Sequence, residues 1–173
     1  LWRLAEERRD AGAPVLVTTS THILIPADGV CDTFVSPDTA DALLRCCKPA
    51  QSICAGYPCG EGKCTGLSPS LFAAPQQAAL HPLYEADGAG RLPAKLHKET
   101  EPVIHPNTDK ILLVAGLRAL GKPVSSVCHR YALSSRMAAN PARSFDTNDL
   151  LETIRDGIRA CGAPAERLRI LIN

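Results

Sequence analysis

Short apolar runs and amphipathic stretches alternate along the chain, a pattern that predicts strands and helices in turn. Helical character is found in four ranges, which are residues 1–12, 36–47, 68–80 and 147–162. Apolar runs typical of strands lie near residues 15–20, 51–55, 82–86, 110–116 and 168–172. Because helices separate these strands, we expect an α/β fold with a mostly parallel sheet of about five strands and helices on both faces.

Several helix ends carry capping signals. Gly12 is expected to end the first helix in the left-handed conformation. Ser36 with Pro37 is expected to open the second, and Thr147 to cap the last. Pro75 lies within the third range and is expected to kink or divide that helix. The apolar face of the last helix is expected to contain Leu150, Leu151, Ile154, Ile158 and Cys161.

Composition bounds the class of protein. A chain of 173 residues is expected to form one domain, spanning residues 1–173. The net charge of +1 gives no reason to expect nucleic acid or an anionic membrane as a partner. No stretch approaches the ~20 apolar residues that cross a bilayer. These features predict a soluble, cytoplasmic protein.

The 8 cysteines raise the question of a metal site. Cys54, Cys59 and Cys64 are evenly spaced within "CAGYPCGEGKC", which could place three thiolates around zinc or an iron–sulfur cluster. The alternative is that all three are reduced thiols, since short motifs often match by chance. We therefore expect all three cysteines to be reduced thiols.

Polar residues cluster where two predicted strands end. The first strand runs into Thr18, Thr19, Ser20, Thr21 and His22, and the third into Glu85, Asp87 and Gly88. Ligands of open α/β sheets bind outside the carboxyl ends of the strands, so these residues predict a shared ligand site. The alternative is that they cap helices or satisfy loop amides.

The stretch after the third strand has the charges of a phosphate site. Asp87 could hold Mg²⁺, and Gly88 would let the backbone approach a phosphate. Arg91, Lys95 and Lys98 could neutralise an anionic ligand, or could form a solvated surface. Glu101 could orient one of these bases or transfer a proton. The loop from 87 to about 109 is long, and its prolines and charges favour an ordered functional loop.

A phosphate-binding protein of this layout should also have a glycine-rich loop after its first strand. No GxxxxGK[ST] sequence occurs in the chain. The chain opens inside a predicted helix and stops within "RILIN". We therefore expect a domain that is truncated at both ends.

Five segments resemble the YqeC family in order and spacing: "VLVTTSTHI", "GKCTGLSP", "YEADGAGRLPAKLHKETEPVIHPNT", "VAGLRALGKPV" and "CHR". Members of this family are described as accessory proteins of selenium-dependent molybdenum hydroxylases, or as selenium cofactor biosynthesis proteins. The resemblance covers almost the whole chain and implies a P-loop-NTPase-like fold. It places a GGKT-type loop before Leu1 and an N-K-x-D or N-Q-x-D-like motif from Asn173.

The resemblance also implies roles for individual residues. Asp87, with Glu85, corresponds to the acidic end of a Walker B-like strand, and Gly88 lies beneath the phosphate. The remaining matches are Thr18, Thr19, Thr21 and His22 with a T-T-x-T-H run, Lys95 and Glu101 with a K…EPVI motif, and His129 and Arg130 with an H-R pair. Ala89 replaces a frequent serine, and His105 interrupts an EPVIP motif, but neither departure removes a charge.

The resemblance therefore implies a nucleotide-binding, NTP-hydrolysing accessory protein that uses Mg²⁺ and ATP or GTP. Its expected partners are the nucleotide and a molybdenum hydroxylase or its cofactor. Two alternatives stay open: a kinase or nucleotidyltransferase acting on a molybdenum-cofactor-type substrate, and a non-catalytic binding module. The expected catalytic residues are Glu85, Asp87, Glu101 and His129, with Asp87 as the metal ligand. His129 could instead be a surface or capping histidine, which is the expectation for His81, His97 and His105. Without a glycine loop, residues 1–173 alone are expected to be inactive.

Overall fold

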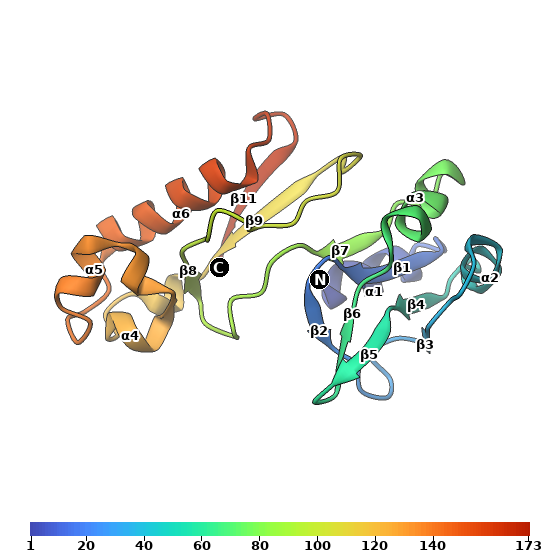
Figure 1. Ribbon diagram of the computed structural model, residues 1–173, viewed down its shortest axis with the longest axis horizontal. Helices are drawn as coiled ribbons and strands as arrows, with labels where there is room; N and C mark the ends of the chain where they lie inside the picture. Colours follow the sequence, from blue (N-terminus) through green and yellow to red (C-terminus); the bar gives the residue numbers. More distant parts are fainter. The chain divides into compact units, whose positions relative to one another are not determined.

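The computed structural model describes residues 1–173 and divides them into two compact units. Unit 1 is Leu1–Gly88 and unit 2 is Ala89–Asn173. In Figure 1, unit 1 runs from blue to green and unit 2 continues to red. That residues 1–173 form a single domain stays a prediction.

Unit 1 contains a four-stranded sheet in which every strand runs parallel to its neighbours. The strand order is β3-β4-β1-β7. The bounds are β1 (Val15–Thr19), β3 (Thr33–Val35), β4 (Ser52–Ala55) and β7 (Leu83–Glu85). All of β1 is buried, as expected of a central parallel strand that is covered on both sides.

The helices of unit 1 cover both faces of this sheet. They are α1 (Trp2–Asp10), α2 (Ala40–Cys46) and α3 (Pro69–Gln77). Ala5 of α1 packs against Val15 and Val17. Leu16, whose side chain points to the other face of β1, joins a cluster with Leu43 of α2 and Phe72 of α3. Alternate residues of one strand therefore join two separate cores.

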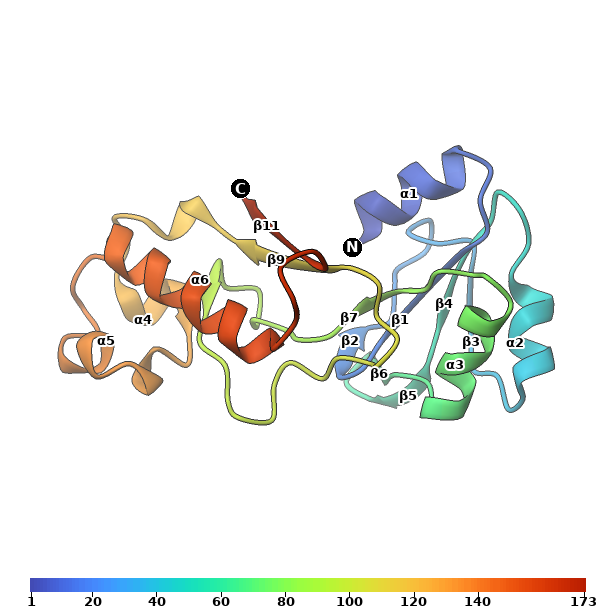
Figure 2. The same cartoon turned by 90° about the horizontal axis from the view of Figure 1, so that it is seen from above.

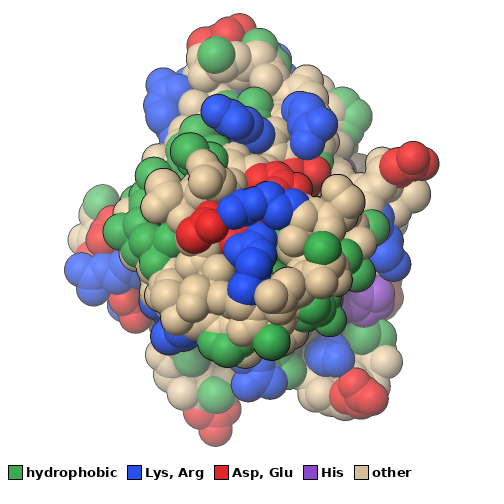
Figure 3. All heavy atoms as spheres, turned by 90° about the vertical axis from the view of Figure 1, so that its left-hand side faces the viewer, with side chains coloured by type: hydrophobic (Ala, Val, Ile, Leu, Met, Phe, Trp, Pro, Cys, Tyr) green, Lys and Arg blue, Asp and Glu red, His purple; other side chains and the backbone are tan.

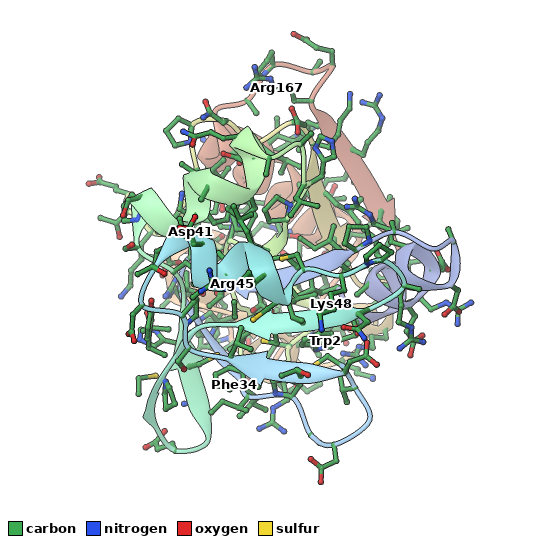
Figure 4. All side chains as sticks on the ribbon, turned by 90° about the vertical axis from the view of Figure 1, so that its right-hand side faces the viewer. Trp2, Phe34, Asp41, Arg45, Lys48 and Arg167 are labelled. Carbon is green, nitrogen blue, oxygen red and sulfur yellow. The ribbon has the colours of Figure 1, made fainter.

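A second, antiparallel sheet of unit 1 was not predicted. It consists of β2 (His22–Leu24), β6 (Lys63–Thr65) and β5 (Tyr57–Gly60), in that order. These strands have only three or four residues each, and β5 contains Pro, Cys and Gly, so their apolar alternation is too weak to detect. Ile23 of β2 is buried in a small core to which Trp2 and Phe34 also contribute (Figure 4).

Unit 2 contains two parallel pairs of strands. One pair is β8 (Ala94–Lys95) with β10 (Cys128–His129), and the other is β9 (Ile111–Ala115) with β11 (Leu168–Ile172). Its helices are α4 (Val124–Val127), α5 (Ser135–Ala139) and α6 (Thr147–Cys161), with 3₁₀ turns at Leu117–Ala119 and Tyr131–Leu133. In both Figure 1 and Figure 2, α6 runs alongside β9 and β11.

The start of α6 is held by a charge cluster around one buried carboxylate. The helix is capped by Asp146, not by Thr147, because the Asp146 carboxylate accepts bonds from the backbone N–H groups of Asn148 and Asp149. Asp149 has no exposed surface, and its carboxylate accepts bonds from the guanidinium groups of Arg136 and Arg143. Figure 3 shows this end of unit 2, where basic and acidic side chains lie side by side.

Several expectations need correction. The chain is α/β with parallel sheets and helices, but its main sheet has four strands, and the predicted strands near 110–116 and 168–172 pair with each other. Thr39 caps α2, while the Ser36 hydroxyl donates to the carbonyl of Gly56 instead. Pro75 lies within α3 near its end and does not divide it.

The apolar face predicted for α6 is only partly correct. Leu150 and Ile154 are buried, whereas Leu151 and Ile158 are exposed by 41% and 37%. Both exposed residues lie at the border of the helix face that packs on the core, where neighbouring residues cover them only in part.

No helix of the chain has both the length and the apolar character needed to cross a membrane.

Candidate functional site

Two of the predicted strand ends are neighbours in unit 1. Thr19, the last residue of β1, is in register with Glu85, the last residue of β7. The Ser20 N–H donates to the Glu85 carbonyl over 3.0 Å, which extends the pairing past both strands. Asp87 and Gly88 follow directly. The hydroxyl-rich end and the acidic end therefore lie beside each other at the carboxyl edge of the sheet.

The threonines at this edge have different surroundings. Thr18 and Thr19 are buried, and their hydroxyls donate to the carbonyls of Ala55 and Glu85 over 2.7 and 2.9 Å. The Thr21 N–H donates to the Thr19 hydroxyl oxygen over 2.9 Å. These bonds tie β1 to both of its neighbours. Thr21 is half-buried and His22 exposed, so these two are accessible from solvent.

The acidic residues have the chemistry that Mg²⁺ requires. Glu85, Asp87 and Gly88 are all partly exposed. A Cβ added to Gly88 would lie 3.1 Å from Glu85 Oε1, so this carboxylate lies close against the glycine backbone. Mg²⁺ typically takes one or two protein carboxylates and completes its shell with water and phosphate oxygens. The chain holds no group of three or more His, Cys, Asp or Glu side chains placed to bind a metal. Glu85 and Asp87 are ligands of the type that Mg²⁺ takes.

The other predicted residues lie together in unit 2. Lys95 of β8 and His129 of β10 are in register, and the Leu96 N–H donates to the His129 carbonyl over 3.0 Å. Arg130 follows β10 directly. Two parallel strands thus end in adjacent basic residues, an arrangement that the sequence separation of more than thirty residues concealed.

Glu101 joins these basic residues into one cluster. Arg130 Nη2 donates to Glu101 Oε1 over 2.7 Å, and Nη1 donates to Oε2. Lys95 Nζ lies 3.0 Å from Glu101 Oε2. The side chain of Lys95 is 7% exposed, and those of Glu101 and Arg130 are each 21% exposed. The hydrogen bonds from Arg130, followed by those from Lys95, lower the pKa of Glu101 to about 2 against the cost of its burial. Glu101 is therefore ionised at neutral pH and accepts bonds from both cations.

Two residues near this cluster have unusual backbone conformations. Arg130 has φ of 60° and Arg91 has φ of 63°, in the left-handed region that non-glycine residues rarely occupy. Such conformations cost about 1–3 kcal/mol and are concentrated at functional sites. Gly90 is left-handed as well, and a Cβ added to it would lie 3.8 Å from His129 Nδ1. The short segment before β8 thus passes close to the histidine.

The three evenly spaced cysteines have different surroundings. Cys54 and Cys64 are fully buried in the core beside Ile23, whereas Cys59 is exposed on β5. Burial, followed by the nearby Cys64 thiol, raises the pKa of Cys54 to about 12. Cys54 is therefore an unreactive, protonated thiol in the core.

One contact in unit 2 corrects the expectation that His97 is a surface or capping histidine. His97 Nδ1 lies 2.8 Å from Asp156 Oδ2, which also accepts the backbone N–H of His97. Both side chains are largely buried. This contact attaches the loop after β8 to α6. His97 lies in a segment that resembles the family, whereas Asp156 belongs to none of those segments, so no motif links the two residues.

Comparison with known proteins agrees with the resemblance seen in the sequence. The model of the YqeC protein family matches residues 1–132, which is more than half of the chain. The "Uncharacterized protein YqeC" of Escherichia coli (strain K12) is 27% identical over 161 residues, which cover 90% of this chain and 62% of the relative. The chain therefore spans less than two thirds of the length of this relative. No solved structure matches the chain.

Proposed function

Because the chain belongs to the YqeC family, we propose that it is part of a nucleotide-binding, NTP-hydrolysing accessory protein. We further propose that the complete protein acts in the maturation of selenium-dependent molybdenum hydroxylases or of their cofactor. Its fold would be P-loop-NTPase-like, with the phosphate-binding loop outside residues 1–173. The nucleotide would be ATP or GTP with Mg²⁺.

One observation carries this proposal. In unit 1, Glu85 at the end of β7 is in register with Thr19 at the end of β1, and Asp87 and Gly88 follow at the same edge. An acid at the carboxyl end of a parallel strand, with a glycine beside it, suits a Mg²⁺ ion that meets phosphate oxygens. Asp87 and Glu85 would hold the ion, directly or through water, and the ion would offset charge that develops on the phosphates.

The cluster in unit 2 favours a second candidate, a kinase or nucleotidyltransferase that acts on a molybdenum-cofactor-type substrate. Lys95 and Arg130 lie at the ends of two parallel strands, and both contact the Glu101 carboxylate. Their positive groups therefore already converge on one negatively charged group. In such an enzyme they would bind an anionic acceptor, and His129 would exchange a proton with it. The hydroxyls of Thr18 and Thr19, which bond to strand carbonyls, instead favour a non-catalytic module.

Turnover by the full-length protein separates these candidates. Magnesium-dependent hydrolysis of ATP or GTP without any acceptor supports the proposed function. Hydrolysis or transfer that requires a molybdenum-cofactor-type acceptor supports the second candidate. If the full-length protein binds neither nucleotide nor cofactor, the non-catalytic module is left. Residues 1–173 alone should show no turnover, since they lack the backbone cradle and lysine of a phosphate loop.

A further inference from the structure

The strand β9 has an open edge in unit 2. It pairs with β11 on one side, where the Ile111 N–H donates to the Arg167 carbonyl over 2.8 Å. In a parallel ladder, alternate residues direct both backbone groups to the same side. The backbone groups of Leu112 and Val114 therefore point away from β11, and no strand of unit 2 pairs with them.

The side chains of this strand pair are also uncovered on one face. Leu113 packs into the core of unit 2, and a Cβ added to Gly157 of α6 would lie 2.7 Å from it, so α6 covers Leu113 on that face. On the opposite face, Leu112, Val114 and Leu171 are exposed by 54%, 52% and 45%. Soluble proteins rarely leave a contiguous apolar patch beside an unpaired strand edge, because such an edge readily binds another strand.

We propose that this edge of β9 receives one further parallel strand, supplied by the same polypeptide from outside residues 1–173. This inference rests on the part of the proposed function that makes the chain a piece of a longer protein. Two observations favour the same polypeptide. The Escherichia coli relative is matched over only 62% of its length, which leaves enough chain for a strand. Every strand pair of unit 2 is parallel. A further parallel strand of the same polypeptide needs a long connection, and that connection is long enough to cover the exposed face of β9 and β11.

The structure restricts where this strand can lie. The next backbone group beyond Val114 on the same edge is already used, because the Gly116 N–H donates to the Pro93 carbonyl over 2.9 Å. A Cβ added to Gly116 would lie 2.7 Å from Pro93 Cβ, so the two backbones are in close contact. The incoming strand therefore pairs with Leu112 and Val114 and ends before Pro93. Its residues that lie beside these two side chains should be aliphatic or β-branched.

Hydrogen exchange at single-residue resolution tests this inference, with and without the additional chain. In the full-length protein without nucleotide, the amides of Leu112 and Val114 should exchange at least ~100-fold more slowly than those of an unpaired edge strand. In residues 1–173 alone, both amides should exchange rapidly while the Leu113 amide, which bonds to β11, stays protected. Leaving out nucleotide keeps this result independent of whether the protein hydrolyses NTP.

The outcomes distinguish a strand of the same polypeptide from a second copy of the protein. Protection that does not change on dilution of the full-length protein supports a strand from the same polypeptide. Protection lost on dilution identifies a second copy and overturns the proposal. Rapid exchange of Leu112 and Val114 in the folded full-length protein also overturns it. A substitution gives an independent check: Val114→Asp should lower the melting temperature of the full-length protein more than Leu133→Asp, which changes a similarly exposed apolar residue of unit 2. Equal effects would contradict the proposal.

Discussion

Arg130 and Glu101 form a two-bond ion pair at the end of β10, with Nη2 donating to Oε1 over 2.7 Å and Nη1 donating to Oε2. The pair fixes the plane of the guanidinium group, and Lys95 Nζ contacts the same carboxylate. Because the pKa of Glu101 is lowered to about 2, the carboxylate is a poor proton acceptor at neutral pH. This geometry favours a positioning role over proton transfer.

Glu101→Gln should destabilise the protein by about 2–4 kcal/mol, because it leaves two largely buried cations without the charge that they face. Denaturant unfolding of residues 1–173 measures this change. Glu99→Gln, at an exposed position two residues away, is the matched control and should change stability by less than about 0.5 kcal/mol. Equal effects of the two substitutions would show that the cluster contributes little to stability.

The same carboxylate predicts a pH dependence. Its folded pKa of about 2 lies below the ordinary value of 4.5, so its contribution is fully present above pH 4.5. The contribution is lost as the pH falls from 4.5 toward 2, since the unfolded chain then takes up the proton first. The difference in unfolding free energy between the wild type and Glu101→Gln should therefore shrink from pH 6 to pH 3. A constant difference over this range would contradict the ion pair.

Gly66→Ala should prevent normal folding of unit 1. An added Cβ would lie 1.6 Å from the Thr19 carbonyl oxygen and 2.7 Å from its carbon, both of them backbone atoms of the central strand. The expected loss exceeds about 3 kcal/mol, because the backbone of β1 must move. Gly88→Ala is the control, since its Cβ would meet only the flexible Glu85 carboxylate. Melting curves for the two variants should differ clearly, and similar curves would refute this close contact.

Asp149→Asn should destabilise unit 2 by about 2–3 kcal/mol, because hydrogen bonds to a charged, buried carboxylate are lost while the two arginines remain partly solvated. The carboxylate has no exposed surface and accepts bonds from both Arg136 and Arg143. Asp10→Asn serves as the control, because that side chain is 69% exposed. Thermal unfolding followed by circular dichroism measures both changes. A loss no larger than that of the control would show that the two arginines are held by other contacts.

Local sequence signals predicted much of the fold but not its pairing. The five predicted strands and the long helix that ends at Cys161 are present because apolar periodicity is a property of neighbouring residues. The partner of β9 could not be predicted, since pairing with β11 depends on residues more than fifty positions away. The cap of α6 was misplaced by one residue, because Asp146 and Thr147 are both good capping residues and only the backbone geometry decides between them.

The candidate site was likewise predictable only where local sequence signals decide it. The adjacent ends of β1 and β7 followed from the rule that parallel strands present their carboxyl ends at one edge. The contact of Glu101 with Lys95 agrees with the expectation that Glu101 orients one of the nearby bases. The additional contact with Arg130 did not follow, because Glu101 belongs to an irregular loop whose path is set by tertiary contacts. The contact between His97 and Asp156 also lay beyond prediction, since a lone histidine and a helix aspartate carry no spacing signal.

The role of Asp87 tests the proposed function most directly. In the full-length protein, Asp87→Asn should reduce magnesium-dependent nucleotide turnover by at least ~100-fold, as expected when one preorganised electrostatic group is removed. Its melting temperature should stay within about 3 °C of the wild type, because Asp87 follows the strand and is not part of a buried core. Asp41→Asn, at an exposed position on α2 (Figure 4), is the control and should retain full turnover. If Asp87→Asn keeps its turnover, or if it unfolds while the remaining folded fraction stays active, Asp87 is a structural cap and does not hold the magnesium ion.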